Sequence, residues 1–142
     1  IRIGIIGTEF RENISIELEK SCVATLRKKG LSNAQIKMVR VPGALEIPLI
    51  AKKMAKQGKY DAIIVFGAII KGKTYHFEQV ANECVRGCMQ VAYDFEIPVV
   101  FEVLSVYDIK DALDRALGKK DNRGVEGALT ALSMIRCMNT II

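Results

Sequence analysis

Asp61-Ala-Ile-Ile-Val-Phe-Gly67 is the stretch that decides the fold, because its unbroken apolar run predicts a strand buried on both faces. Similar β-branched runs occupy residues 1–6, 36–41 and 98–104. Apolar residues between and after these runs recur at helical spacing. Because strands and helices alternate, we expect one α/β domain over residues 1–142. Its four-stranded parallel sheet should carry helices on both faces.

Sheets of this kind bind ligands at the carboxyl ends of their strands. The loops expected there are residues 7–13, 42–46, 67–76 and 102–108. The last predicted helix is apolar around much of its circumference between Val125 and Met138. We therefore expect the sheet to cover one side of this helix and a neighbouring subunit to cover another.

The charge pattern narrows the classes of partner. The chain has 21 Lys and Arg against 16 Asp and Glu, a net charge of +5. The basic residues are scattered, which argues against nucleic acid and leaves a small anionic substrate. The longest apolar run, residues 62–70, is too short to span a membrane. The four cysteines form no CxxC pair and no leader opens the chain, so we expect free thiols, no metal site and a cytoplasmic protein.

Gly67-Ala-Ile-Ile-Lys-Gly-Lys-Thr74 matches the P-loop pattern GxxxxGK[ST], between a predicted strand and a predicted helix. Three features argue against a nucleotide hydrolase, which stays as the alternative. The match follows the third strand rather than the first, Ile69 and Ile70 are bulky for a phosphate loop, and no later strand ends in a clear magnesium-binding Asp.

The end of this motif still suits a phosphate, because Gly72, Lys73 and Thr74 precede a helix whose N-terminal amides attract anions. His76, the only histidine, follows at once. A lone histidine is more often structural, but an imidazole next to a bound phosphate can transfer protons near neutral pH. We interpret His76 as catalytic.

Three motifs together resemble 6,7-dimethyl-8-ribityllumazine synthases: Val41-Pro-Gly-Ala-Leu-Glu-Ile-Pro48, Gly67-Ala-Ile-Ile-Lys-Gly-Lys-Thr-Tyr-His76 and Asn122-Arg-Gly-Val-Glu126. They occur in the family's order and at its spacing, over nearly the whole chain. The resemblance implies a flavodoxin-like, three-layer αβα sandwich. It also implies the penultimate step of riboflavin biosynthesis, a transferase reaction that condenses 5-amino-6-(D-ribitylamino)uracil with 3,4-dihydroxy-2-butanone 4-phosphate.

The same resemblance implies a reaction without metal or organic cofactor. It implies pentamers, which in some members build icosahedral shells, with the active site at the subunit interface and with riboflavin synthase as an associated protein. Neither nucleic acid nor a membrane is an implied partner. A non-catalytic flavin- or lumazine-binding shell protein of the same fold is a further alternative.

For the pyrimidine and its ribityl chain, the resemblance implies that Phe10 stacks on the ring and that Glu46 accepts hydrogen bonds from hydroxyl groups. From the residues alone, Phe10 is equally well a core residue, and Glu46 equally well a first-turn glutamate favoured by the helix dipole. The other implied contacts, with Phe101 coming from an adjacent subunit, are Ala44, Leu45, Ala68, Ile69, Ile70 and Phe101.

For the butanone phosphate, the resemblance implies contacts from Lys73, Thr74 and Arg115, whose guanidinium suits bidentate phosphate binding. His76 matches the family's proton donor. Alone, Arg115 would pass for a solvated helix charge. Positions near the rim of the site, which otherwise fit a surface loop and a helix start, are Lys119, Arg123 and Glu126.

Some positions depart from the family's usual pattern. Arg11 replaces the common Asn, Glu102 replaces a usual Gly, and Arg123 replaces a Lys. Ser105-Val106 replaces a frequent Thr pair. These departures affect details of pyrimidine binding, and they leave the phosphate and proton-transfer positions unchanged.

Overall fold

The computed structural model describes residues 1–141 and contains one parallel sheet of four strands in the order β2-β1-β3-β4. The central pair is formed by β1 and β3, so β2 and β4 are the edge strands. The strands are β1 (Ile3–Thr8), β2 (Ile36–Val41), β3 (Ala62–Ile70) and β4 (Val99–Val106).

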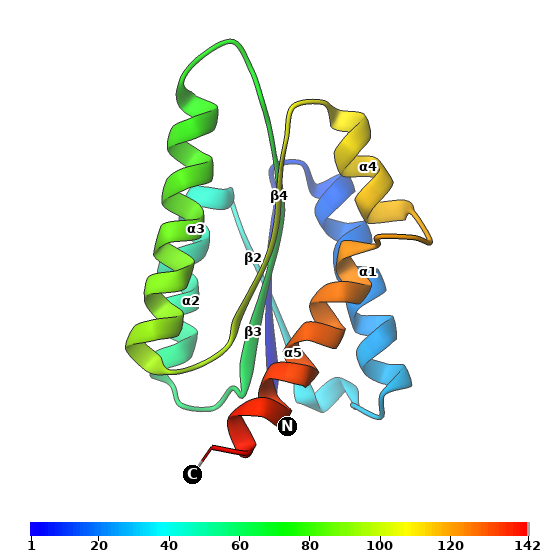
Figure 1. Cartoon of the computed structure of the whole chain (residues 1–142), viewed down its shortest axis with the longest axis vertical. Helices are drawn as coiled ribbons and strands as arrows, with labels where there is room; N and C mark the ends of the chain where they lie inside the picture. The colour runs from blue at the N-terminus through cyan, green and yellow to red at the C-terminus, as the bar shows by residue number, and fades with distance from the viewer. Residues whose placement is uncertain (142) are drawn as a thin grey trace.

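Helices cover both faces of the sheet, as Figure 1 shows. One face carries α2 (Ile47–Lys56) and α3 (His76–Phe95). The other face carries α1 (Glu12–Lys28), α4 (Ile109–Leu117) and α5 (Arg123–Asn139). Two short 3₁₀ turns, η1 (Asn33–Gln35) and η2 (Ala44–Glu46), flank β2. The predicted three-layer αβα sandwich of flavodoxin-like type is confirmed.

β3 explains the two layers of helices. Its first eight residues are all buried, and successive side chains enter opposite cores. Ile64 and Phe66 pack with α1 and α5, whereas Ile63 and Val65 pack with α2 and α3. A strand that is apolar on both faces is stable only when both faces are covered.

The carboxyl ends of β3 and β4 extend further along the chain than the sequence predicted. β1 pairs with β3 only as far as Val65, but β3 and β4 stay paired to Ile70 and Val106. Residues 68–70 are therefore strand, and the loops expected from residues 67 and 102 begin only at residues 71 and 107. The P-loop interpretation loses its main requirement, because Gly67 to Ile70 are extended and paired with β4 and cannot wrap around a phosphate.

α5 lies close to the sheet and to α1 (Figure 1). The helix buries its side chains of Ala128, Ala131 and Ile135. It leaves those of Leu129, Met134 and Met138 exposed. The apolar surface of α5 is thus wider than the part that the rest of this chain covers, as the sequence pattern indicated. Within residues 1–141 no helix has the length and apolar content to cross a membrane.

Replacing Gly124 by alanine should destabilise the fold. A Cβ at this position would overlap the Leu18 carbonyl oxygen and lie 2.8 Å from the Ser21 Cβ. Alanine favours helix by about 1 kcal/mol over glycine, but overpacking against backbone typically costs about 1–3 kcal/mol or more. Urea unfolding of Gly124→Ala should show a net loss of stability. Gly72→Ala is the control, because a Cβ there meets no atom within 4 Å; equal stability of both variants would contradict the close packing.

Candidate active site

A cleft of about 430 Å³ opens at the carboxyl ends of β1 and β3. Four segments line it: the turn after β1, η2, the end of β3 and the start of α3. The predicted site residues that it brings together are Phe10, Ala44, Leu45, Glu46, Ala68, Ile69, Ile70, Thr74 and His76. These come from three separate stretches of sequence, and the parallel sheet is what collects them at one edge.

Phe10 is exposed at the mouth of the cleft, with 66% of its surface accessible, so it is not a core residue. Its backbone N–H donates to the Pro42 carbonyl oxygen (2.9 Å), which ties the turn after β1 to the segment before η2. The guanidinium carbon of Arg11 lies 5.4 Å from the centre of the Phe10 ring. Since Arg11 also lines the cleft, it would be a neighbour of any ring stacked on Phe10.

A buried polar network holds the Phe10 turn, and the sequence reasoning missed it. The Thr8 hydroxyl donates to the Phe10 carbonyl oxygen (3.0 Å), and the Thr8 N–H donates to the Ser15 hydroxyl (3.0 Å). Ser15 donates in turn to the Glu19 carboxylate (2.6 Å), which pairs with Arg40 of β2. The available signal was the i, i+4 spacing of Ser15 and Glu19 on one helix face.

The start of α3 presents the predicted phosphate and proton-transfer residues. The His76 N–H lies 3.4 Å from the Thr74 hydroxyl oxygen, and Tyr75 at the N-cap makes no side-chain cap. Uncapped first-turn amides and the helix dipole make such an end a binding site for anions. Lys73 is exposed on the same loop but does not line the cleft.

Lys71 fixes this loop to the turn after β4. Its Nζ lies 2.8 Å from a Glu78 carboxylate oxygen and 5.6 Å from the ring centres of Phe77 and Tyr107. The hydrogen bond raises the pKa of Lys71 and lowers the pKa of Glu78. The loop is thus held from two sides, which keeps Thr74 and His76 next to each other.

The remaining predicted residues lie elsewhere on the chain. Phe101, Arg115 and Arg123 line a second hollow of about 210 Å³ along the outer edge of β4. Glu126 lines an adjoining groove of about 870 Å³ with Phe101, Met134 and Met138. Lys119 is exposed and lines neither. One chain therefore carries two separate groups of predicted site residues, a cleft group and a β4-edge group.

Comparison with known families shows which family the chain belongs to. The family model of 6,7-dimethyl-8-ribityllumazine synthase matches residues 1–139, which include both groups. The chain belongs to this family. Among residues 1–141, no cluster of three or more His, Cys, Asp or Glu is arranged to hold a metal ion.

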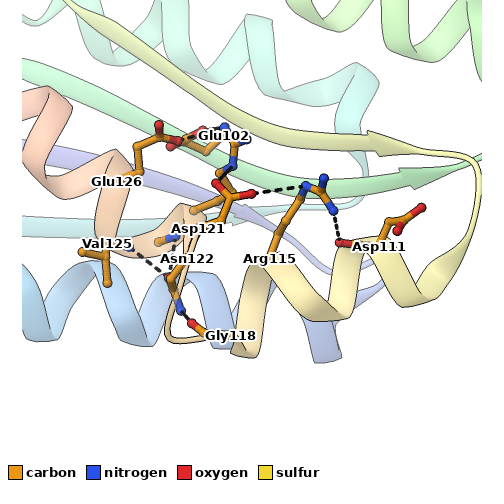
Figure 2. Close-up of polar contacts among 10 residues, drawn as sticks. Glu102, Asp111, Arg115, Gly118, Asp121, Asn122, Val125 and Glu126 are labelled. Carbon is orange, nitrogen blue, oxygen red and sulfur yellow. Dashed lines mark hydrogen bonds and ion pairs between the residues drawn. The ribbon is translucent and has the colours of Figure 1, made fainter.

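The β4-edge group of this lumazine synthase family member is joined by a polar network (Figure 2). Arg123 lies 2.9 Å from a Glu126 carboxylate oxygen and 3.2 Å from one oxygen of Asp121. The other Asp121 oxygen is 3.9 Å from Nε of Arg115, which donates from Nη1 to the Asp111 carbonyl oxygen (2.9 Å). Asp121 thus connects the two arginines.

Glu102, which departs from the family's usual Gly, is the buried member of this network, with 7% of its surface exposed. Burial, and then a hydrogen bond to the neighbouring Glu126, raise the pKa of Glu102 to about 8, although Arg123, 3.9 Å away, opposes the shift. The carboxyl group therefore keeps its proton to a higher pH than an exposed glutamate does.

Glu102→Gln should remove a pH dependence of stability. The pKa of Glu102 is higher in the folded chain (about 8) than its ordinary value of 4.5. Its contribution is thus complete below pH 4.5 and is lost as the pH rises towards 8. Between pH 5 and 8, the wild type should lose about 2–4 kcal/mol relative to Glu102→Gln, measured by urea unfolding. Glu126→Gln should narrow this pH range, because Glu126 contributes to the raised pKa of Glu102. Identical plots of stability against pH for the wild type and Glu102→Gln would contradict the raised pKa of the buried carboxyl.

Proposed function

We propose that the protein is a lumazine synthase, which condenses 5-amino-6-(D-ribitylamino)uracil with 3,4-dihydroxy-2-butanone 4-phosphate. The observation that carries the proposal is the cleft. It joins an exposed aromatic ring, Phe10, with the uncapped start of α3 that bears Thr74 and His76. These are the parts that the reaction requires: a platform for a flat ring, an anion site for the leaving phosphate and a proton carrier between them.

The site is completed, in this proposal, by an adjacent subunit. Phe101 and Arg115 line the outer edge of β4, and α4, which carries Arg115, covers the sheet face opposite to α3 (Figure 1). A neighbour that presents its β4-edge group to the cleft of the next chain would supply both residues. Contact between two different surfaces is head-to-tail, and such contacts form a ring when the rotation between neighbouring chains closes.

The size of the ring, a pentamer, and its assembly into icosahedral shells rest on the family alone. The exposed Met134 and Met138 in the groove beside β4 support the contact, because they would be buried by the neighbouring chain. Association with riboflavin synthase is proposed on the same basis. All four cysteines are free, which suits the reducing conditions of the cytoplasm.

The reaction follows from these groups. The pyrimidine amine attacks the ketone of the butanone phosphate and loses water to give an imine. Loss of a proton and departure of phosphate follow, and the amides at the start of α3, the Thr74 hydroxyl and the neighbour's Arg115 stabilise the charge that develops on the phosphate. The enol that remains takes up a proton at its terminal carbon and becomes a second ketone. The ribitylamino nitrogen attacks this ketone to close the ring, and a second water leaves. His76 carries protons in these steps, and holding two reactants together supplies much of the rate.

The direct test is formation of product. The assembled protein supplied with both substrates should produce a compound with lumazine absorbance and fluorescence, together with equimolar phosphate. Binding of the pyrimidine without any product would instead support the non-catalytic binding protein. ATP hydrolysis dependent on magnesium would support the nucleotide hydrolase.

Two single variants should affect different kinetic constants. His76→Ala removes the proton carrier and should lower kcat by about ten- to a thousand-fold. Arg115→Ala removes a phosphate contact and should mainly raise KM for the butanone phosphate, by about ten-fold or more. Steady-state kinetics with each substrate varied separately measures both constants. An unchanged KM for Arg115→Ala would contradict its role in binding phosphate.

Mixed oligomers test whether the two groups come from different chains. In a ring assembled from equal amounts of His76→Ala and Arg115→Ala chains, about one quarter of the interfaces combine an intact cleft with an intact β4 edge. At concentrations of the butanone phosphate well below the raised KM of Arg115→Ala, co-assembled protein should therefore regain about a quarter of wild-type activity. If each site lies within one chain, mixing restores nothing; oligomers of each variant alone are the controls.

A further inference from the structure

Asp121 occupies the space between the two arginines of the β4-edge group. One of its oxygens is 3.2 Å from Nε of Arg123 and the other is 3.9 Å from Nε of Arg115 (Figure 2). The carboxylate thus bridges two guanidinium groups, as two oxygens of a phosphate monoester would. Neither the sequence pattern nor the resemblance assigns a role to Asp121.

The position of Asp121 is set by the backbone of the turn between α4 and α5. Its φ angle is 49°, in the left-handed region that Asp and Asn tolerate better than most residues. The next residue, Asn122, donates to the Gly118 carbonyl oxygen (3.0 Å) and accepts from the N–H groups of Gly124 and Val125 (3.0 and 3.1 Å). These bonds fix the backbone of the turn, and this backbone directs the Asp121 side chain towards the two arginines.

The two arginines are already balanced by negative charge. Arg123 faces the Glu126 carboxylate at 2.9 Å as well as Asp121, and the Glu102 carboxyl lies 3.9 Å away. Arg115 has Asp121 as its one ion-pair partner among residues 1–141. An incoming phosphate therefore meets two arginines paired with two carboxylates, and its affinity depends on displacing Asp121.

We propose that Asp121 is an internal competitor for the phosphate group of the substrate, and so determines how tightly Arg115 holds phosphate esters. This inference rests on the proposed function, because it takes Arg115 as the phosphate ligand. Asp121 pairs with both arginines before phosphate binds and is displaced when the dianionic phosphate binds. It also returns to Arg115 when phosphate leaves, which favours release of the inorganic phosphate produced in the reaction.

The competition is moderate in strength. The side chains of Asp121, Arg115 and Arg123 are 57%, 36% and 33% exposed, so their ion pairs are partly hydrated and weakened by salt. Removing one negative charge at this distance should tighten phosphate binding by about three- to ten-fold at low ionic strength. The gain should shrink as salt is added.

The test uses Asp121→Asn, which keeps the size of the side chain and tolerates the left-handed backbone. The dissociation constant of inorganic phosphate, measured by ³¹P NMR on the assembled protein, should fall by about three- to ten-fold. Asp94→Asn removes the same charge from an exposed site on α3, next to Gln90, and should leave the constant unchanged. Adding Arg115→Ala to Asp121→Asn should abolish the gain.

An unchanged or weaker affinity for phosphate in Asp121→Asn, with an unchanged unfolding midpoint, would overturn the proposal. Asp121→Gly, which suits the same backbone angle, gives a second measurement if the asparagine variant unfolds. The titration needs no turnover, so it decides the role of Asp121 even if the protein makes no lumazine. With turnover, KM for the butanone phosphate should fall by the same factor.

Discussion

The burial of β3 on both faces is the constraint on which the rest of the structure depends. Ile63 to Phe66 send alternate side chains into two cores, and each core needs its own layer of helices. Parallel neighbours connected through those helices follow, since such a connection returns every strand in the same direction. The carboxyl ends then meet at one edge, where the cleft lies. Burial of one strand thereby brings together residues that are more than sixty positions apart in the sequence, Phe10 and His76 among them.

Much of this arrangement was predictable, because it follows from local patterns. The second strand, residues 36–41, lies where its apolar run indicated, and the motif residues of the cleft converge as the sheet rule requires. The ends of β3 and β4 were not predictable in this way. Their last residues are strand because β3 and β4 pair with each other beyond the point where β3 stops pairing with β1, and pairing between distant segments leaves no local signal.

The residues that line the cleft were predictable from the sequence, but the separation of the predicted site residues into two groups was not. Motifs named both Thr74 and Arg115, yet no pattern in the sequence indicated that they lie in separate hollows of one chain. The positions of Asp121 and Glu102 beside the arginines were missed for a related reason. Asp121 sits in a polar turn and Glu102 in a buried strand, and only the three-dimensional fold places both next to Arg123. The net charge of +5 therefore says little about this region, where arginines and carboxylates balance locally.

The central proposal is a site built from two chains, with the cleft of one and the β4 edge of the next. The most direct measurement is a crystal structure of the assembled protein with a ribitylated pyrimidine and inorganic phosphate bound. The pyrimidine should be stacked on Phe10 of one chain, with phosphate between Thr74 of that chain and Arg115 of its neighbour. Phosphate held by Thr74 without any arginine, or a pyrimidine bound away from Phe10, would contradict it.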